Sequence, residues 1–238
     1  MPDHSAARGG RIPTGVPGLD AVLHGGFLSH GVYILIGPSG AGKTTLANQI
    51  AFAHAATSSV RYVTVLAETH TRLLGQIGQF AFYDPALVGT CITYLSGYAA
   101  FQAGSYTGLL QFLLPLVRIE APALLVIDGL PLTTPGAVYD PSLKNLIHDL
   151  QVAGEFGRCT ILILSPAHTG VWESRALMLV DGALEVTRRV RDDILERRIQ
   201  VQIFRGGTHQ PGNYPMTMDP GGVVVQAPPT IDDDTPSQ

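Results

Sequence analysis

Short apolar runs and helical patterns alternate along the first two thirds of the chain. The strand-like runs fall at Val32–Ile36, Arg61–Leu66, Cys91–Leu95, Ala123–Ile127 and Cys159–Leu164. The segments of helical composition fall at Thr45–Ala56, Thr71–Phe82, Tyr106–Ile119 and Pro141–Phe156. Because strands that alternate with helices usually form a parallel sheet, this pattern predicts an α/β fold, a mostly parallel central sheet with helices on both faces.

The pattern changes after Arg175. Shorter strand-like segments separated by turns follow at Ala183–Arg189, Arg197–Phe204, Tyr214–Met218 and Gly222–Val225. They predict a C-terminal antiparallel extension of the same sheet. The glycine-containing segment Tyr98–Tyr106 is interpreted as a loop, either a plain surface connection or a mobile loop that contacts a partner.

The two ends of the chain differ in composition from the rest. Residues 1–10 are polar, and residues 226–238 contain three prolines and the acidic run Asp232–Asp234. Both ends are therefore predicted to be disordered tails of a single domain at residues 11–225. At 238 residues with 45% hydrophobic content, the chain is long enough to bury a large core.

Charge and cysteine content narrow the functional classes. The formal net charge is −4, which gives no general electrostatic case for nucleic acid. A local arginine cluster at residues 188–198 leaves open either a solvated hairpin or a DNA-binding patch. No apolar run is long enough to span a membrane, and no apolar signal segment is visible. Cys91 and Cys159 are isolated, which is typical of a reducing compartment, so the protein is expected to be cytoplasmic.

Residues 37–44 read Gly-Pro-Ser-Gly-Ala-Gly-Lys-Thr, a full match to the phosphate-binding P-loop pattern. An apolar strand precedes the motif and a helix follows it, so backbone N–H groups would form a cradle for phosphate. Lys43 is expected to reach the β- and γ-phosphates, and the Thr44 hydroxyl to ligate Mg²⁺. The expected nucleotide-binding residues here are Gly37, Pro38, Ser39, Gly40, Ala41, Gly42, Lys43, Thr44 and Thr45.

Two other apolar strands end in an acidic residue. Asp128 follows the run 123–127, as in the Walker B arrangement, where the carboxylate supports Mg²⁺. Glu68 follows the strand at 61–66 and is the candidate for orienting and deprotonating the attacking water. A helix-capping role for Glu68 is the alternative. His70 and His168 also lie near strand ends, where capping or surface roles are more common than catalysis.

The combined pattern resembles the KaiC-type ATPases of the RecA superfamily. The opening stretch 11–27 contains Arg-Ile-Pro-Thr-Gly-Val-Pro-Gly-Leu-Asp and Gly-Gly-Phe, and Arg-Gly-Gly-Thr-His at 205–209 resembles the closing motif of that family. With Glu68 and Asp128 in order, the resemblance covers about residues 11–225. It implies a RecA-like P-loop NTPase fold, ATP and Mg²⁺ as ligands, and an opening segment close to the nucleotide site.

The resemblance also implies assembly into a ring, usually a hexamer, with ATP at the subunit interfaces. In such a ring the closing motif reaches the neighbour's γ-phosphate. Arg205 would act in trans in the manner of an arginine finger, with His209 as its companion. The alternative for Arg205 is a strand-end residue beside a glycine turn.

The chain departs from the family pattern at three places. Ala67 replaces the first of two adjacent glutamates, and Ile203 replaces a lysine of the closing motif. Leu177 and Met178 stand where clock-type members carry phosphorylated Ser and Thr, so serine/threonine autokinase activity is not expected. The main hypothesis is a slow, switch-type ATPase. The alternatives are a nucleotide-gated scaffold with negligible hydrolysis and a DNA-recombination accessory ATPase.

Overall fold

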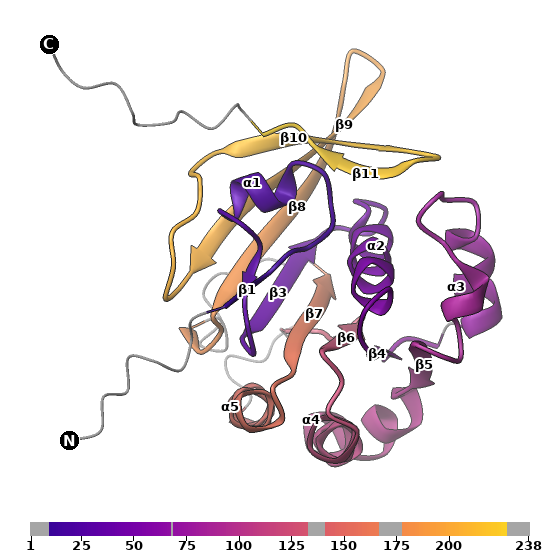
Figure 1. Ribbon diagram of the computed structural model, residues 1–238, viewed down its shortest axis with the longest axis vertical. Helices are drawn as coiled ribbons and strands as arrows, with labels where there is room; N and C mark the ends of the chain where they lie inside the picture. The colour runs from indigo at the N-terminus through magenta and orange to yellow at the C-terminus, as the bar shows by residue number, and fades with distance from the viewer. Residues whose placement is uncertain (1–9, 68, 133–140, 167–177, 228–238) are drawn as a thin grey trace, which may run out of the picture.

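One nine-stranded sheet forms the centre of the described part of the chain (Figure 1). The computed structural model describes residues 10–67, 69–132, 141–166 and 178–227. The strand order is β11-β10-β9-β8-β3-β7-β6-β4-β5. The six strands from β8 to β5 are parallel, and β9, β10 and β11 add to the β8 edge in antiparallel fashion. The sequence-based prediction of a parallel sheet with an antiparallel extension is therefore confirmed, except that β8, which the sequence analysis assigned to the extension, pairs parallel with β3.

The apolar runs become strands that helices bury on both faces. The parallel strands are β3 (Val32–Gly37), β4 (Val60–Thr64), β5 (Ile92–Ser96), β6 (Leu124–Asp128), β7 (Thr160–Pro166) and β8 (Gly182–Arg191). The antiparallel strands are β9 (Ile194–Phe204), β10 (Asn213–Asp219) and β11 (Gly222–Val225). Every residue of β3 and β6 is buried, which explains why their sequences are continuously apolar rather than alternating.

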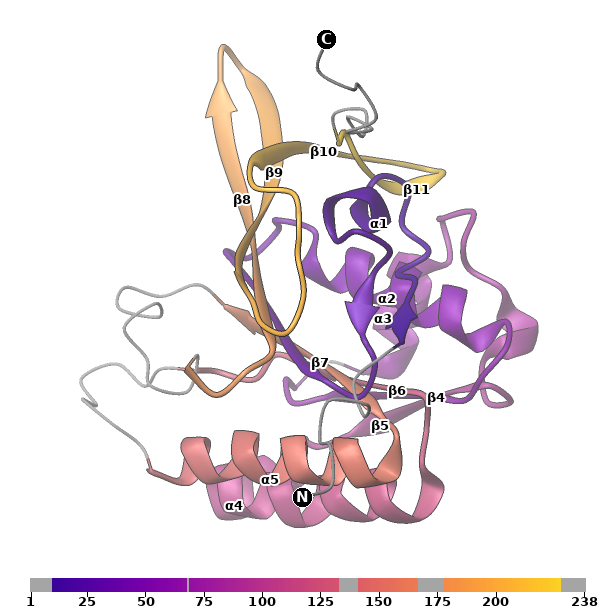
Figure 2. The ribbon, with the colours of Figure 1, turned by 60° about the vertical axis from the view of Figure 1, so that its left-hand side comes forward.

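Helices cover the two faces of the sheet in pairs (Figure 2). On one face, α2 (Lys43–Ala55) and α3 (His70–Ile77) contribute to a core that includes Leu46, Ile50 and Leu73. On the other face, α4 (Tyr98–Pro115) and α5 (Pro141–Gly157) lie side by side over a second core. A short 3₁₀ helix, η2 (Pro85–Leu87), and a π-helical turn, η3 (Leu116–Glu120), complete these layers.

The segment Tyr98–Tyr106, which the sequence analysis interpreted as a loop, is the first half of α4. That interpretation was wrong because glycine and serine weighed against a helix, whereas packing favours one. The Phe101 and Tyr106 rings pack edge to face with centroids 5.4 Å apart, and the Tyr106 hydroxyl donates to the Pro131 carbonyl at 2.7 Å. Within this segment the backbone is non-helical only at Ser105, where φ is 51° and the helix is kinked.

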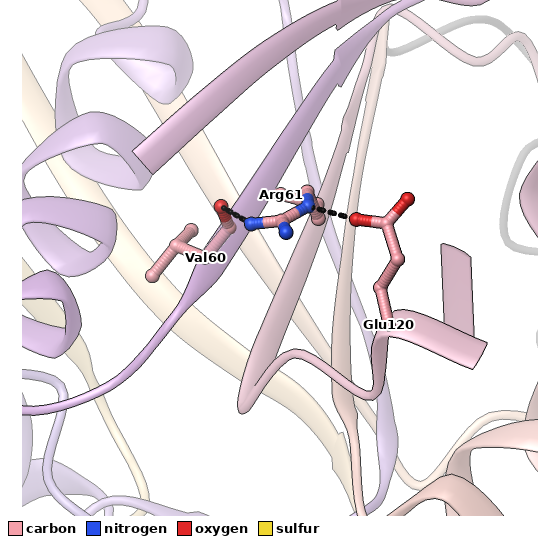
Figure 3. A network of polar contacts seen from close by, with 3 residues as sticks. All are labelled: Val60, Arg61 and Glu120. Atoms are coloured by element: carbon pink, nitrogen blue, oxygen red, sulfur yellow. Dashed lines mark hydrogen bonds and ion pairs between the residues drawn. The ribbon is translucent and has the colours of Figure 1, made fainter. Parts of the chain in front are cut away.

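An ion pair holds the outer parallel strands to the helical layer (Figure 3). The Arg61 guanidinium on β4 donates to the Glu120 carboxylate at the end of η3. It also donates to the Val60 carbonyl oxygen at 3.2 Å. Because both side chains are partly exposed, the pair fixes the position of η3 more than it adds to stability.

The opening segment folds as a small unit of its own. The two-stranded sheet of β1 (Arg11–Ile12) and β2 (Phe27–Leu28) encloses the helical turn α1 (Leu19–Val22). The Asp20 carboxylate accepts hydrogen bonds from the Thr14 backbone N–H at 2.6 Å and the Thr14 hydroxyl at 2.7 Å. Elements this short carry no periodic signal, so the sequence pattern did not predict them.

Of the helices in the described ranges, none combines the length and the apolar character that crossing a membrane requires.

Candidate nucleotide-binding site

The phosphate loop connects β3 to α2 at the carboxyl end of the parallel strands. Gly40 and Gly42 have φ angles of 73° and 104°, a region that residues with a Cβ rarely adopt. A Cβ on Gly40 would also lie 2.5 Å from a guanidinium nitrogen of Arg188. The two glycines therefore allow a turn that a residue with a Cβ would adopt only with strain.

Lys43 opens helix α2 with its ammonium group folded back over the loop. Its Nζ donates to the Gly37 carbonyl at 2.6 Å and to the Pro38 carbonyl at 3.0 Å. Burial lowers the pKa of Lys43, and the nearby Asp128 carboxylate partly opposes that change. The ammonium group thus lies inside the curve of the loop, where a phosphate could replace the two carbonyl oxygens.

Thr44 and Asp128 meet at the start of α2. The Thr44 hydroxyl donates to Asp128 Oδ2 at 3.0 Å, across 84 residues of sequence. Asp128 is the last residue of β6 and lies in register between Thr64 on β4 and Leu164 on β7. The structure therefore brings together the two side chains, Thr44 and Asp128, that the sequence analysis named as Mg²⁺ ligands.

These two oxygen-bearing side chains fit Mg²⁺ better than a transition metal. Hydroxyl and carboxylate oxygens are ligands that Mg²⁺ accepts, and it usually takes few of them from protein. Within the described residues there is no group of three or more His, Cys, Asp or Glu side chains that could hold a metal ion. Thr44 and Asp128 could therefore hold Mg²⁺ together with phosphate and water, rather than forming a complete cage.

A buried polar chain lies directly beneath this pair, and the sequence analysis missed it. The Tyr62 hydroxyl donates to Asp128 Oδ2 at 2.8 Å, and Asn48 Nδ2 donates to the Tyr62 hydroxyl at 3.1 Å. The Tyr94 hydroxyl in turn donates to Asn48 Oδ1 at 2.7 Å. Burial, followed by the negative charge of Asp128, raises the pKa of Tyr62 well above its ordinary value, so the hydroxyl keeps its proton.

The far end of β8, where it pairs with β9, borders the phosphate loop. Arg188 on β8 donates from Nη1 to the Ser39 carbonyl at 3.2 Å. Its cross-strand neighbour Arg197 has its Nε buried and without a hydrogen-bond partner among the described residues. Arg198 donates to the Asn213 side chain at 3.3 Å. Arg188 and Arg198 are therefore engaged within the chain, whereas Arg189 and Arg191 are exposed.

Two of the predicted residues near the strand ends are outside the described ranges, and one is inside them. Glu68 and His168 lie outside the described residues. His70 begins α3, and its Nε2 lies 3.3 Å from the Thr64 hydroxyl. Its ring centroid is 6.0 Å from that of Tyr94. His70 thus borders the polar chain beside Asp128, although sequence reasoning favoured a capping or surface role.

Arg205 and His209 lie at the other end of the sheet. Arg205 follows β9, its backbone N–H donates to the Asp181 carbonyl at 2.7 Å, and its side chain is exposed. The preceding residue Phe204 pairs with the first residue of β8, level with Tyr33 near the start of β3. At about 3.3 Å per residue, this position is about 13 Å from the phosphate loop along the strand direction. Arg205 therefore lies well away from the phosphate loop of its own chain.

Arg11 joins the opening segment to the closing motif. Its guanidinium donates to the carbonyls of Leu23 and Gly26, the latter at 2.9 Å, and to the Thr208 carbonyl at 3.1 Å. It also lies over the Phe204 ring, 5.4 Å from the centroid. His24 Nδ1 and the Thr208 hydroxyl are 2.9 Å apart. Burial, followed by the charge of His24, lowers the pKa of the neighbouring His209.

The position of the opening segment differs from the expectation that it lies close to the nucleotide site. A Cβ on Gly15 would lie 2.4 Å from the Ala53 side chain, near the C-terminal end of α2. Nine residues of helix, or about 13 Å, separate Ala53 from Thr44. Within one chain the opening segment therefore packs against the far end of α2 rather than beside its own phosphate loop.

Comparison with known proteins agrees with this architecture. The family model "ATPase: KaiC" matches residues 12–82. A UPF0273 protein of Thermotoga maritima is 24% identical over 233 residues, which cover 90% of this chain and 95% of that protein. A UPF0273 protein of Pyrococcus horikoshii is 22% identical over 233 residues, covering 90% and 93%. The crystal structure of a KaiC-like protein from Pyrococcus horikoshii aligns with a TM-score of 0.72 at 22% identity, covering 91% of this chain and 98% of that one.

The strand order and the phosphate loop define a RecA-like fold. The KaiC ATPase family model matches the N-terminal third of the chain, and the whole fold is similar to that of the KaiC-like protein from Pyrococcus horikoshii.

Proposed function

We propose that the protein binds and hydrolyses ATP with Mg²⁺ at the phosphate loop. The observation that carries this proposal is the convergence of Lys43, Thr44 and Asp128 at the carboxyl end of β3 and β6. Lys43 would bind the β- and γ-phosphates, and the backbone N–H groups of residues 37–45 would surround them. Thr44 and Asp128 would hold Mg²⁺, which neutralises charge on the phosphates.

Glu68 is the proposed base for the attacking water, because it follows β4, the strand next to Asp128. A carboxylate at this sheet edge would orient the water and take its proton. Replacing it with glutamine should keep nucleotide binding and abolish turnover. This separation of binding from turnover distinguishes a catalytic base from a helix-capping residue.

We further propose that catalysis is completed by a neighbouring subunit in a ring, in which Arg205 and His209 contact the γ-phosphate in trans. The distance between Arg205 and its own phosphate loop supports this arrangement, since the side chain is exposed and follows β9 at the opposite end of the sheet. The family resemblance supports a hexamer. A developing negative charge on the phosphate would then be stabilised across the interface.

Turnover is expected to be slow, as in a switch. Ala67 stands where the family has a glutamate, and Ile203, in the position of a lysine, is half-buried against the core under α4 and α5. The trans contact would therefore carry one positive charge fewer. A scaffold that binds nucleotide with negligible hydrolysis is the second candidate, and the same two residues favour it.

Steady-state ATP hydrolysis and nucleotide affinity, measured together with oligomer size, test the proposal. Lys43→Ala should abolish binding, whereas Glu68→Gln should abolish turnover alone. Lys144 on α5 is exposed and is the only other lysine in the chain, so Lys144→Ala is the matched control. If the wild-type protein binds ATP but turns over no faster than Glu68→Gln, the scaffold replaces the enzyme as the conclusion.

A further inference from the structure

The hydrogen bonds of the polar chain beneath Asp128 can have only one assignment of donors and acceptors. Asn48 Nδ2 contacts the Thr44 carbonyl oxygen at 2.8 Å, and that oxygen can only accept a hydrogen bond. The amide of Asn48 therefore turns its NH₂ toward Thr44 and Tyr62, which places its oxygen toward Tyr94. Because Asn48 donates to the Tyr62 hydroxyl, the proton of that hydroxyl is free for Asp128.

Asp128 Oδ2 accepts two of these hydrogen bonds, one from Thr44 at 3.0 Å and one from Tyr62 at 2.8 Å. Nucleotide binding would affect these two donors differently. The Thr44 hydroxyl is also the proposed ligand of Mg²⁺, so its lone pairs must turn toward the metal. Tyr62 is fully buried on β4 and has no competing task, so it would keep its hydrogen bond throughout.

We propose that Tyr62 is a positioning residue for Mg²⁺, which it holds in place through Asp128. This inference rests on the proposed nucleotide site. Residues that orient a metal-binding carboxylate from behind commonly change metal affinity by 10- to 100-fold. Tyr62 orients Asp128 in this way. Asn48 is hydrogen-bonded to Tyr62, and Tyr94 is hydrogen-bonded to Asn48. Residues of α2, β4 and β5 therefore fix the position of the proposed metal-binding carboxylate.

The test measures how strongly Mg²⁺ and nucleotide assist each other's binding, without using hydrolysis. The affinity of the full chain for a fluorescent ATP analogue is measured in EDTA and across a Mg²⁺ titration. In Tyr62→Phe, the affinity in EDTA should stay unchanged. The increase in nucleotide affinity that Mg²⁺ produces should be about tenfold smaller than in the wild-type chain. A higher Mg²⁺ concentration should also be needed to reach half of that increase.

Tyr33→Phe is the matched control. Tyr33 is equally buried and lies near the start of β3, away from the phosphate loop. Its hydroxyl is hydrogen-bonded to the backbone of Leu28. It should lose stability as Tyr62→Phe does but retain the full Mg²⁺ effect. Tyr94→Phe removes only the outer bond of the chain and should lower the Mg²⁺ effect less than Tyr62→Phe does.

Each result has a definite meaning. If the Mg²⁺ effect in Tyr62→Phe is within twofold of that in Tyr33→Phe, the positioning role is refuted. If Tyr62→Phe does not fold, Tyr94→Phe decides: an unchanged Mg²⁺ effect overturns the proposal and a reduced one supports it. If the wild-type chain binds no nucleotide at all, the proposed function itself fails, which is a different outcome from these.

Discussion

Replacing Arg11 with alanine should loosen the closing motif without changing the phosphate loop. The Arg11 guanidinium donates to the carbonyls of Leu23, Gly26 and Thr208, and it lies over the Phe204 ring. The variant therefore removes the main polar link between the opening segment and the residues that follow β9.

The size of the effect follows from the contacts. Hydrogen bonds to charged groups contribute about 1.5–3 kcal/mol each when buried, and Arg11 is only half-buried. At about 1 kcal/mol for each of the three acceptors, the free energy of unfolding should fall by about 3 kcal/mol. For a domain of this size, that corresponds to a melting temperature lower by about 6–12 °C. Arg11→Lys should recover part of the loss, because a single ammonium group reaches fewer of the acceptors.

Urea denaturation and amide hydrogen exchange check this prediction. Exchange at residues 205–210 should become faster in Arg11→Ala, while exchange in β3 and α2 follows the global change alone. Arg118→Ala is the control, because Arg118 is exposed on η3. A loss of stability in Arg11→Ala within about 0.5 kcal/mol of the control would show that the Arg11 contacts contribute nothing measurable to the free energy of unfolding.

Three further predictions concern other parts of the molecule. Gly18→Ala should destabilise the protein by about 2–4 kcal/mol in urea denaturation, because φ at Gly18 is 79° and a Cβ there would lie 1.8 Å from a carbonyl oxygen of β11. Gly104→Ala, where a Cβ meets open space, should not destabilise it. Thiol reagents should label Cys91 in the native protein and leave Cys159 unmodified until denaturant is added, because burial raises the pKa of the Cys159 thiol to about 12. Burial lowers the pKa of His54 below its ordinary 6.5, so the unfolded chain binds more protons. Stability should therefore fall as pH drops below 6.5 toward the folded-state pKa, and His54→Gln should reduce that slope, whereas an equal slope in both proteins would exclude His54 as the source.

The sheet could be predicted from the sequence because its strands are buried on both faces. Such strands must be continuously apolar, and β3 and β6 carry that signal plainly. The phosphate loop was equally predictable, since its glycines are required by the backbone path. By contrast, the first half of α4 was interpreted as a loop. Its composition is that of a loop, and only the packing of residues such as Phe101 makes it helical.

The polar chain of Asn48, Tyr62 and Tyr94 could not be predicted from sequence. Its residues come from three elements, and each of them is an ordinary residue type for the helix or strand that contains it. Tyrosine is common in strands, and nothing in the spacing indicates that two of them share an asparagine. Asp128 could be predicted because an acid ends an apolar strand, whereas the residues that hold it are specified only by the register between strands.

The placement of Lys43 and Arg205 at opposite ends of one sheet has a genetic consequence. In the proposed ring, a subunit with Lys43→Ala keeps its arginine and a subunit with Arg205→Ala keeps its phosphate loop. Each variant alone would be inactive, yet random mixing of equal amounts would join the two intact halves at about a quarter of the interfaces. Co-expression of two dead alleles should therefore restore about a quarter of the wild-type activity, a form of intragenic complementation.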